Sequence, residues 1–250
     1  MRLLFALLAL FALTGARDPI LVSDVSQHEV QVRQGFHGAD LLLFGAILDP
    51  QGTRAGRDYD IVVVLKGPTN PVLLRQKRKM AGLWINADST EFHSVPSYFA
   101  MAASRPIDQI VDAKTAAIYE LGLPSLQLSP TGAIDPDAVQ RFAAGLVDLM
   151  ARKGLYRQDQ RGVRLSEQVL YQARLTLPSN VRTGSYTAEA FAISRGRVVA
   201  TSLSEVEVRK LGFEGAVAQF ARHYAFAYGL LAVGLSVLMG WLAGRIFALV

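Results

Sequence analysis

The sequence predicts a mainly β protein with a two-helix segment and one transmembrane helix at its C-terminal end. Three observations support this: short apolar segments bounded by glycine and proline, two stretches of helical periodicity between them, and the uncharged run 224–244. The 250 residues are 51% hydrophobic with a mean hydropathy of +0.25, and two terminal blocks contain most of the excess. Without these blocks, roughly 200 residues remain, enough for one sizeable domain or two small ones.

The N-terminal block has the pattern of a secretory signal peptide. Arg2 precedes the apolar residues 3–13, which are too few to span a bilayer. Thr14, Gly15 and Ala16 then supply the small residues that a signal peptidase recognises. We expect residues 1–16 to be cleaved, and loss of Arg2 lowers the formal net charge from +5 to +4.

The C-terminal block predicts a transmembrane helix over residues 224–244. At 1.5 Å per residue this run spans about 31 Å, close to the hydrocarbon thickness of a bilayer. Tyr224 and Tyr228 mark one interface and Trp241 the other, while Arg245 can reach the headgroups. We expect a helical lead-in over 211–223 and a cytoplasmic tail over 245–250. Export of the N-terminal end makes this a single-pass inner-membrane protein with most of its chain in the periplasm.

Small residues recur at every fourth position of this helix. Ala232, Ser236, Gly240 and Gly244 form the ridge, which Ala248 extends, and Gly240 and Gly244 make a G-x-x-x-G motif. Such a ridge lets another helix approach closely, so a membrane-protein partner or a homodimer is expected. The alternative is that glycine and alanine are simply common in membrane helices.

Residues 17–107 predict a β-rich exported region. Val30 and Val32 alternate with polar residues, and His28 has the same parity, so its side chain is expected to point inward. The continuous apolar runs 41–48 and 61–65 suit central strands that are covered on both faces. Residues 35–38 are expected to form a turn, 71–75 and 83–86 resemble shorter strands, and 97–104 is ambiguous.

Residues 108–153 predict two helices. The first covers 108–121 and places Ile110, Val111, Ala117, Ile118 and Leu121 on one side. The second begins at Asp135 and Pro136, runs to residue 153 and ends at Gly154. Its predicted buried stripe consists of Val139, Phe142, Leu146 and Leu149.

Residues 154–210 return to strands, at 168–177, 185–193 and 197–209. Arg195 and Gly196 are expected to form the turn between the last two. The Gly184-x-Tyr186 entry into an alternating strand is similar to the final strands of immunoglobulin-like β-sandwiches. These strands complete one sandwich or form a second.

An ordered series of short motifs resembles the family catalogued as alphaproteobacterial "putative transmembrane proteins". The resemblance runs from about residue 24 to 244, and the family label implies a membrane-attached protein without assigned activity. The motifs are Ser26-x-His28, Leu43-Phe44-Gly45-Ala46, Gly82-x-Trp84-x-Asn86, Val95-Pro96-Ser97-x-Phe99, Arg105-Pro106, Glu207-Val208-Arg209-Lys210-x-Gly212 and Tyr228-Gly229.

The residue content argues against several classes of enzyme. There is no cysteine, which excludes disulfides, a thiolate nucleophile and iron–sulfur clusters. The phosphate-binding, dinucleotide-binding, serine-hydrolase and zinc-protease motifs are absent from the sequence. We therefore expect a non-enzymatic protein without a cofactor.

A metal site is the second interpretation of the histidines. His28, His37 and His93, with Glu91 or Met101 nearby, could bind copper or zinc. Their spacing favours no particular site. We therefore expect His28 to be buried with its hydrogen bonds satisfied, and the other histidines to face solvent.

A cluster of cations marks a candidate anion-binding segment. Arg75, Lys77, Arg78 and Lys79 fall within five residues. Because the domain is expected to be exported, nucleic acid is not expected as a partner. Anionic lipid headgroups, an acidic partner or a solvated hairpin remain. Trp84, Tyr98 and Phe99 are expected in the core more readily than on a recognition surface.

The leading functional hypothesis is a non-enzymatic accessory subunit that binds or positions another component of an envelope or transport complex. The alternatives are a ligand- or metal-binding module that serves a transporter and, last, a periplasmic hydrolase.

Overall fold

The computed structural model describes residues 19–32, 36–48, 59–80, 82–132, 135–167, 169–210, 217 and 220–247. The expected signal peptide, Gly35 of the expected turn, much of the lead-in 211–223 and the end of the tail lie outside these ranges. The chain divides into two compact units. The first contains Met1–Val30 and His37–Val208, and the second contains Gln31–Phe36 and Arg209–Val250.

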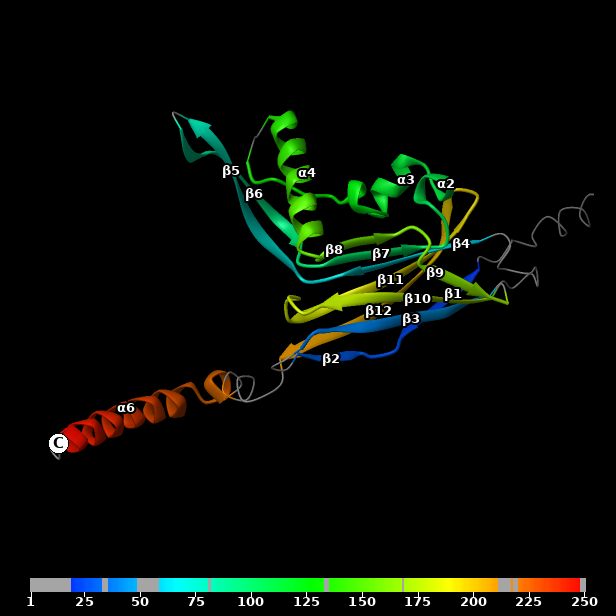
Figure 1. Ribbon diagram of the computed structural model, residues 1–250. Coiled ribbons are helices and arrows are strands. Elements are labelled where there is room, and N and C mark those ends of the chain that lie inside the picture. The colour runs from blue at the N-terminus through cyan, green and yellow to red at the C-terminus, as the bar shows by residue number, and fades with distance from the viewer. Residues whose placement is uncertain are drawn as a thin grey trace, which may run out of the picture. The chain divides into compact units, whose positions relative to one another are not determined.

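The first unit is built on two β-sheets that face each other (Figure 1). The four-stranded sheet has the order β1-β3-β10-β9: Ile20–Val25, Gly38–Leu48, Leu170–Pro178 and Val163–Ser166. The six-stranded sheet has the order β2-β12-β11-β4-β7-β8: Glu29–Val32, Arg197–Lys210, Gly184–Ser194, Asp60–Lys66, Phe99–Ala103 and Tyr156–Asp159. The two sheets form one sandwich, so the C-terminal strands complete it and do not build a second.

This strand order is compatible with an immunoglobulin-like sandwich. The four-stranded sheet follows the A-B-E-D order of such folds, and β12-β11-β4 follows G-F-C. The Tyr186 hydroxyl donates a hydrogen bond of 2.7 Å to the Arg182 carbonyl, an arrangement like the tyrosine corner of these sandwiches. Burial raises the pKa of Tyr186 to about 12, so this donor stays protonated at neutral pH.

The central strand β4 is apolar because both of its faces are covered. Ile61, Val63 and Leu65 alternate with Val62 and Val64, and all five are fully buried. One face packs toward the four-stranded sheet. The other face, with Phe191, belongs to a core cluster completed by Ile107, Ile110, Val111, Ala116, Leu121 and Tyr156.

Strand β3 corrects the expectation that both of its faces are covered. Leu41, Leu43 and Ile47 are buried, whereas Phe44 and Leu48 are exposed. The described residues place no layer over this outer face, so a continuous apolar run here has only one buried side. The apolar run alone could not distinguish this strand from β4.

The helical segment between β7 and β8 contains α2 (Ile107–Ile110), α3 (Ala113–Ile118), η2 (Leu123–Ser125) and α4 (Pro136–Arg152). The expected helix over 108–121 is wrong, because it is broken in two. Asp112 caps α3 by accepting a hydrogen bond of 2.8 Å from the Thr115 amide, and this turn interrupts the helix. As a result Ala116 is buried and Ile118 is exposed.

The long helix α4 begins after Asp135, as the sequence predicts, and Gly154 follows its end. Phe142 and Leu146 are buried as expected, but Val139 is half-buried and Leu149 is 40% exposed. Ala143, Val147 and Met150 are partly buried instead. The buried stripe is therefore rotated toward the i+1 and i+4 neighbours of Phe142 and Leu146.

A long hairpin, which we call the arm, extends the central strands. It consists of β5 (Thr69–Met80) and β6 (Leu83–Pro96), so the two short strands expected here are parts of much longer ones. Gly67 donates to the Tyr98 carbonyl and Ser97 to the Pro68 carbonyl, both at 2.9 Å, which joins the β5–β6 ladder to that of β4 and β7. The ambiguous segment 97–104 contains the buried strand β7 (Phe99–Ala103).

The second unit contains the transmembrane helix predicted from the sequence. Helix α6 covers Ala225–Phe247, and its part Ala225–Arg245 is long and apolar enough to cross a bilayer. None of this segment is buried inside the part of the chain that the structure describes. Residue 217 and residues 220–223 are helical, and Tyr224 bends the chain before α6.

Candidate binding surface on the hairpin arm

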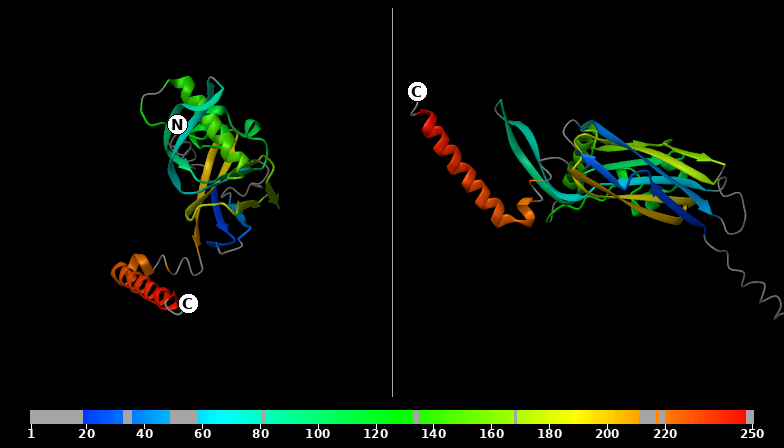
Figure 2. Two further views of the ribbon diagram at one scale, coloured as in Figure 1. Left: turned by 60° about the vertical axis from the view of Figure 1, so that its left-hand side comes forward. Right: turned by 90° about the horizontal axis from the view of Figure 1, so that it is seen from below.

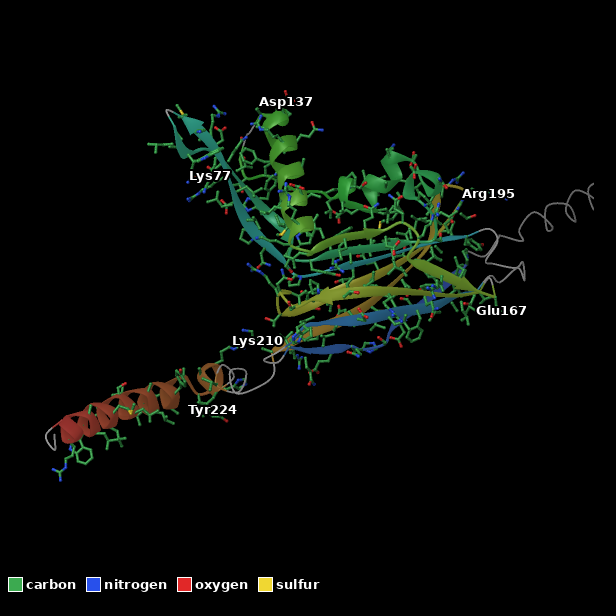
Figure 3. The ribbon with its side chains drawn as sticks, viewed as in Figure 1. Lys77, Asp137, Glu167, Arg195, Lys210 and Tyr224 are labelled. Atoms are coloured by element: carbon green, nitrogen blue, oxygen red, sulfur yellow. The ribbon has the colours of Figure 1, made fainter. Side chains whose placement is uncertain are left out.

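The arm leaves the sandwich beside helix α4 (Figures 1 and 2). Its base is fixed by a small core in which Phe92 and Val95 of β6 pack against Phe142 and Leu146 of α4. Beyond this core, at residues 75–80 and 83–89, the side chains of the arm are exposed, apart from the half-buried Gln76. Lys77 on the arm lies at one end of the unit, and Glu167 and Arg195 lie at the opposite end (Figure 3).

A groove of about 420 Å³ runs between β5 and α4. Its wall and floor combine apolar and basic side chains from two elements far apart in the sequence. They are Leu74, Arg75 and Gln76 from β5, and Arg141, Phe142, Gly145, Asp148, Leu149 and Arg152 from α4. We call this the arm groove.

The charge of the arm groove is positive. Three of its lining residues, Arg75, Arg141 and Arg152, carry cations and one, Asp148, carries an anion, which leaves a net charge of +2. Arg152 forms an ion pair with Asp148 one helical turn away, and their hydrogen bond holds the pKa of Asp148 below its usual range. The Arg141 guanidinium lies 5.9 Å from the ring centroid of Phe142.

One polar atom beside the groove lacks a partner. The side-chain oxygen of Gln76 is buried and accepts no hydrogen bond from the part of the chain that the structure describes. A buried acceptor without a donor costs roughly 1–3 kcal/mol. A donor from a binding partner or from water would relieve this cost. The net positive charge and the apolar lining residues of the arm groove suit an anionic, partly apolar surface that also offers a hydrogen-bond donor to Gln76.

The far end of the arm is a second exposed feature. Met80, Leu83, Trp84 and Ile85 are 54%, 71%, 67% and 42% exposed, respectively. We call these four residues, together with Lys77, Arg78 and Lys79, the arm tip. Arg78 lies 3.3 Å from Asp88 across the hairpin, the one carboxylate that an ion pair places here among the described residues.

The four cations predicted from the sequence are therefore divided between two places. Arg75 lines the arm groove, while Lys77, Arg78 and Lys79 belong to the arm tip. Sequence reasoning missed Arg141 and Arg152. A signal existed, because Arg141, Gly145, Asp148 and Arg152 are spaced by four, three and four residues and so share one helix face.

A family model described as "Putative transmembrane protein (Alph_Pro_TM)" matches residues 20–248, which include the sandwich, the arm and α6. The chain belongs to this family. No curated protein matches the chain significantly.

Solved structures show only distant similarity to this family member. The sporulation control protein Spo0M of Bacillus subtilis gives 6% identity and a TM-score of 0.27, with 83% of this chain and 55% of that chain covered. The bacterial hydrophobin BslA gives 11% identity and a TM-score of 0.23, with 79% of this chain and 99% of that chain covered. A C-terminal fragment of the major pilin GBS80 of Streptococcus agalactiae gives 10% identity and a TM-score of 0.25, with 77% of this chain and 56% of that chain covered. The chain thus spans about half the length of Spo0M, and TM-scores this low assign no function.

The expected position of His28 is wrong. Its side chain is 66% exposed and lies 3.1 Å from Asp24, because β2 starts only at Glu29 and His28 precedes it in a bend. His37 and His93 are also exposed. Within the described ranges no group of three or more histidine, aspartate or glutamate side chains is placed to hold a metal ion.

The aromatic residues divide differently from the expectation. Tyr98 and Phe99 are fully buried, and the Tyr98 hydroxyl donates a hydrogen bond of 2.9 Å to the Thr176 carbonyl of the other sheet. Trp84 is exposed on the arm tip. In α6, Ala232, Ser236, Gly240 and Gly244 are exposed, and the Ser236 hydroxyl donates to the Ala232 carbonyl at 2.9 Å.

Another exposed apolar surface lies on the outer face of the four-stranded sheet. A shallow hollow of about 590 Å³ is lined by Val22, Phe44 and Leu170, and Asp24 is its charged lining residue. The cross-strand register places Val22, Ala46 and Leu170 in one row. The residues that line this hollow include no basic side chain, whereas three arginines line the arm groove.

Proposed function

We propose that the protein is a non-enzymatic accessory subunit of an envelope or transport complex, anchored in the inner membrane by α6, with its sandwich in the periplasm. The single observation that carries this proposal is the arm groove, which exposes arginines beside apolar side chains between two elements. Such a surface suits an acidic, partly apolar segment of another protein.

The ridge of α6 supplies a second route to the same complex. Ala232, Ser236, Gly240 and Gly244 would allow a partner helix, or the helix of a second copy, to approach closely within the bilayer. A partner bound by both surfaces would gain from the effective concentration that one contact gives the other.

The binding proposal is tested by site-specific photocrosslinking of the full-length protein in its native membrane. A photoreactive residue replaces Gly145, because a Cβ placed there meets no atom within 4 Å apart from its chain neighbours and the nearby backbone of α4. Arg197, the exposed first residue of β12, carries the same group as the matched control. We expect a discrete crosslinked product from position 145, and its loss when Arg75→Glu and Arg141→Glu are introduced together.

Identical products from positions 145 and 197, or no product from position 145, would contradict the groove as the binding surface. Adding Gly240→Leu to the position 145 variant tests the ridge separately. A lower yield of the same product indicates that α6 contributes to the complex, because leucine blocks close helix packing.

The orientation is tested by reporter fusions after Val250. The proposal expects a fluorescent reporter that folds only in the cytoplasm to be active, and alkaline phosphatase, which requires the periplasm, to be inactive. The reverse pattern would place the sandwich in the cytoplasm.

A further inference from the structure

We infer that the arm tip docks onto the surface of an anionic bilayer, as a second membrane contact besides α6. The inference begins with the distribution of charge. Residues 77–88 contain three cations, Lys77, Arg78 and Lys79, and one carboxylate, Asp88, for a net charge of +2. A basic side chain near an anionic lipid surface contributes about 1 kcal/mol.

The second step is the distribution of apolar side chains around the tip. Cross-strand partners point to the same face of a hairpin, and the register pairs Met80 with Leu83 and Lys79 with Trp84. Met80 and Leu83 therefore lie on one face and Trp84 on the other. The next pair, Arg78 and Ile85, returns to the first face.

This arrangement distinguishes a fluid partner from a rigid one. A folded protein surface would cover one face of a two-stranded ribbon and leave the other apolar face in water. The interfacial region of a bilayer surrounds an inserted tip on both faces. Tryptophan is favoured at that depth, and lysine and arginine reach outward to the headgroups.

The third step is the position of the arm relative to the point where the chain leaves the sandwich. Along β11, Gly184 pairs with Val208 of β12, and Thr187 pairs with Lys66 of β4. Along β11, the last pairing of the strand that continues into the arm and the last pairing of the strand that continues toward α6 are thus three residues apart, at the same end of the six-stranded sheet.

The lengths involved are compatible with contact. Sixteen residues, 209–224, separate Val208 from α6, and a segment of this length spans at most about 55 Å when fully extended. The twelve residues of β5 span about 40 Å at 3.3 Å per residue. The arm is therefore long enough to reach the bilayer that α6 crosses whenever segment 209–224 spans less than about 40 Å.

The test uses the arm tip's own tryptophan in the full-length protein. The chain has two tryptophans, so a Trp241→Phe variant leaves Trp84 as the only tryptophan fluorophore. This variant is reconstituted in nanodiscs of pure phosphatidylcholine or of phosphatidylcholine with phosphatidylglycerol. In the anionic nanodiscs we expect a blue-shifted Trp84 emission and an acrylamide quenching constant at least twofold lower than in the neutral nanodiscs.

Charge-reversal variants connect the shielding to the cations. Lys77→Glu, Arg78→Glu and Lys79→Glu together are expected to remove the difference between the two lipid compositions. Reversal of the exposed Arg164, Arg174 and Arg197, which lie outside the arm, is the matched control and should retain it. The comparison of Trp84 quenching between the two lipid compositions uses the Trp241→Phe variant with its arm-tip cations intact. It therefore tests the inference even if the triple variant is unstable.

Two results would overturn the inference. Equal quenching in both nanodiscs would show that the arm tip does not recognise anionic lipid. Shielding that persists in detergent and rises with protein concentration would instead identify a second copy of the chain as the occupant. Neither result bears on the arm groove, whose crosslinking test reads a different surface.

Discussion

Gly45 lies at a closely packed point of the four-stranded sheet. It pairs with Ser23 of β1 and Tyr171 of β10. A Cβ at this position would overlap the Val22 carbonyl oxygen and lie 2.6 Å from the Tyr171 hydroxyl. The absence of a side chain lets the Tyr171 hydroxyl donate to the Val22 carbonyl across β3, at 3.2 Å. Burial raises the pKa of Tyr171 to about 12, so the donor keeps its proton.

Gly45→Ala is therefore expected to lower the free energy of unfolding by about 1–3 kcal/mol, because backbone atoms cannot move aside as a flexible side chain can. Gly145→Ala is the matched control. Its helical site is open, and alanine there should stabilise α4 by about 0.5–1 kcal/mol. The measurement is urea unfolding of the full-length protein in mild detergent, followed by near-ultraviolet circular dichroism. Equal effects of the two substitutions would contradict the close packing at Gly45.

Helix α4 is the element that holds the base of the arm. Leu146 is fully buried against Phe92 and Val95, whereas Leu149, less than one turn away, is 40% exposed in the arm groove. Two leucines three residues apart on α4 therefore have different roles: Leu146 packs in the core at the base of the arm, and Leu149 lines the arm groove.

Leu146→Ala is expected to cost about 2–5 kcal/mol, since it leaves a cavity between α4 and β6. Hydrogen exchange should then accelerate in β5 and β6 more than in β11. Leu149→Ala, with the same change of side chain, should cost less than about 1 kcal/mol and leave exchange in the arm unchanged. A similar loss for both variants would mean that α4 does not anchor the arm through Leu146.

Elements with strong local signals could be predicted from the sequence. Strand β4 is a continuous apolar run, α4 has a proline at its first position, and Arg195 and Gly196 both adopt positive φ in the turn between β11 and β12. Strands β8 and β9 have four residues each, with few apolar side chains, so their pattern carried little information. The length of the arm was missed because its outer pairs are stabilised by cross-strand hydrogen bonds and have no buried face.

The binding surface was only partly predictable for a related reason. A run of cations is visible in the sequence, but the arm groove joins Arg75 to Arg141, and nothing local indicates that β5 and α4 lie together. The exposed His28 illustrates the converse problem. Parity predicts orientation only within a strand, and His28 precedes the first residue of β2.

At the scale of the whole molecule, membrane attachment depends on α6. The segment Ala225–Arg245 carries one charged residue, Arg245, at its end. Leu235 is its midpoint, where an arginine costs about 3 kcal/mol on insertion scales.

Leu235→Arg should shift part of the protein from the membrane pellet to the supernatant after extraction with alkaline carbonate. Leu203→Arg, a matched change at an exposed position on β12, should leave the protein in the pellet. Complete retention of the Leu235→Arg variant would show that attachment does not depend on α6 alone.

Because hydrogen bonds join the β5–β6 ladder to that of β4 and β7, the length of the arm determines how far this protein can reach. Two residues added to each strand near the turn would lengthen the ribbon by about 7 Å and keep every side chain on its original face. One residue added to each would exchange the two faces at the tip. Evolution can therefore change how far the sandwich stands from its target in steps of two residues, without altering a single position in the core.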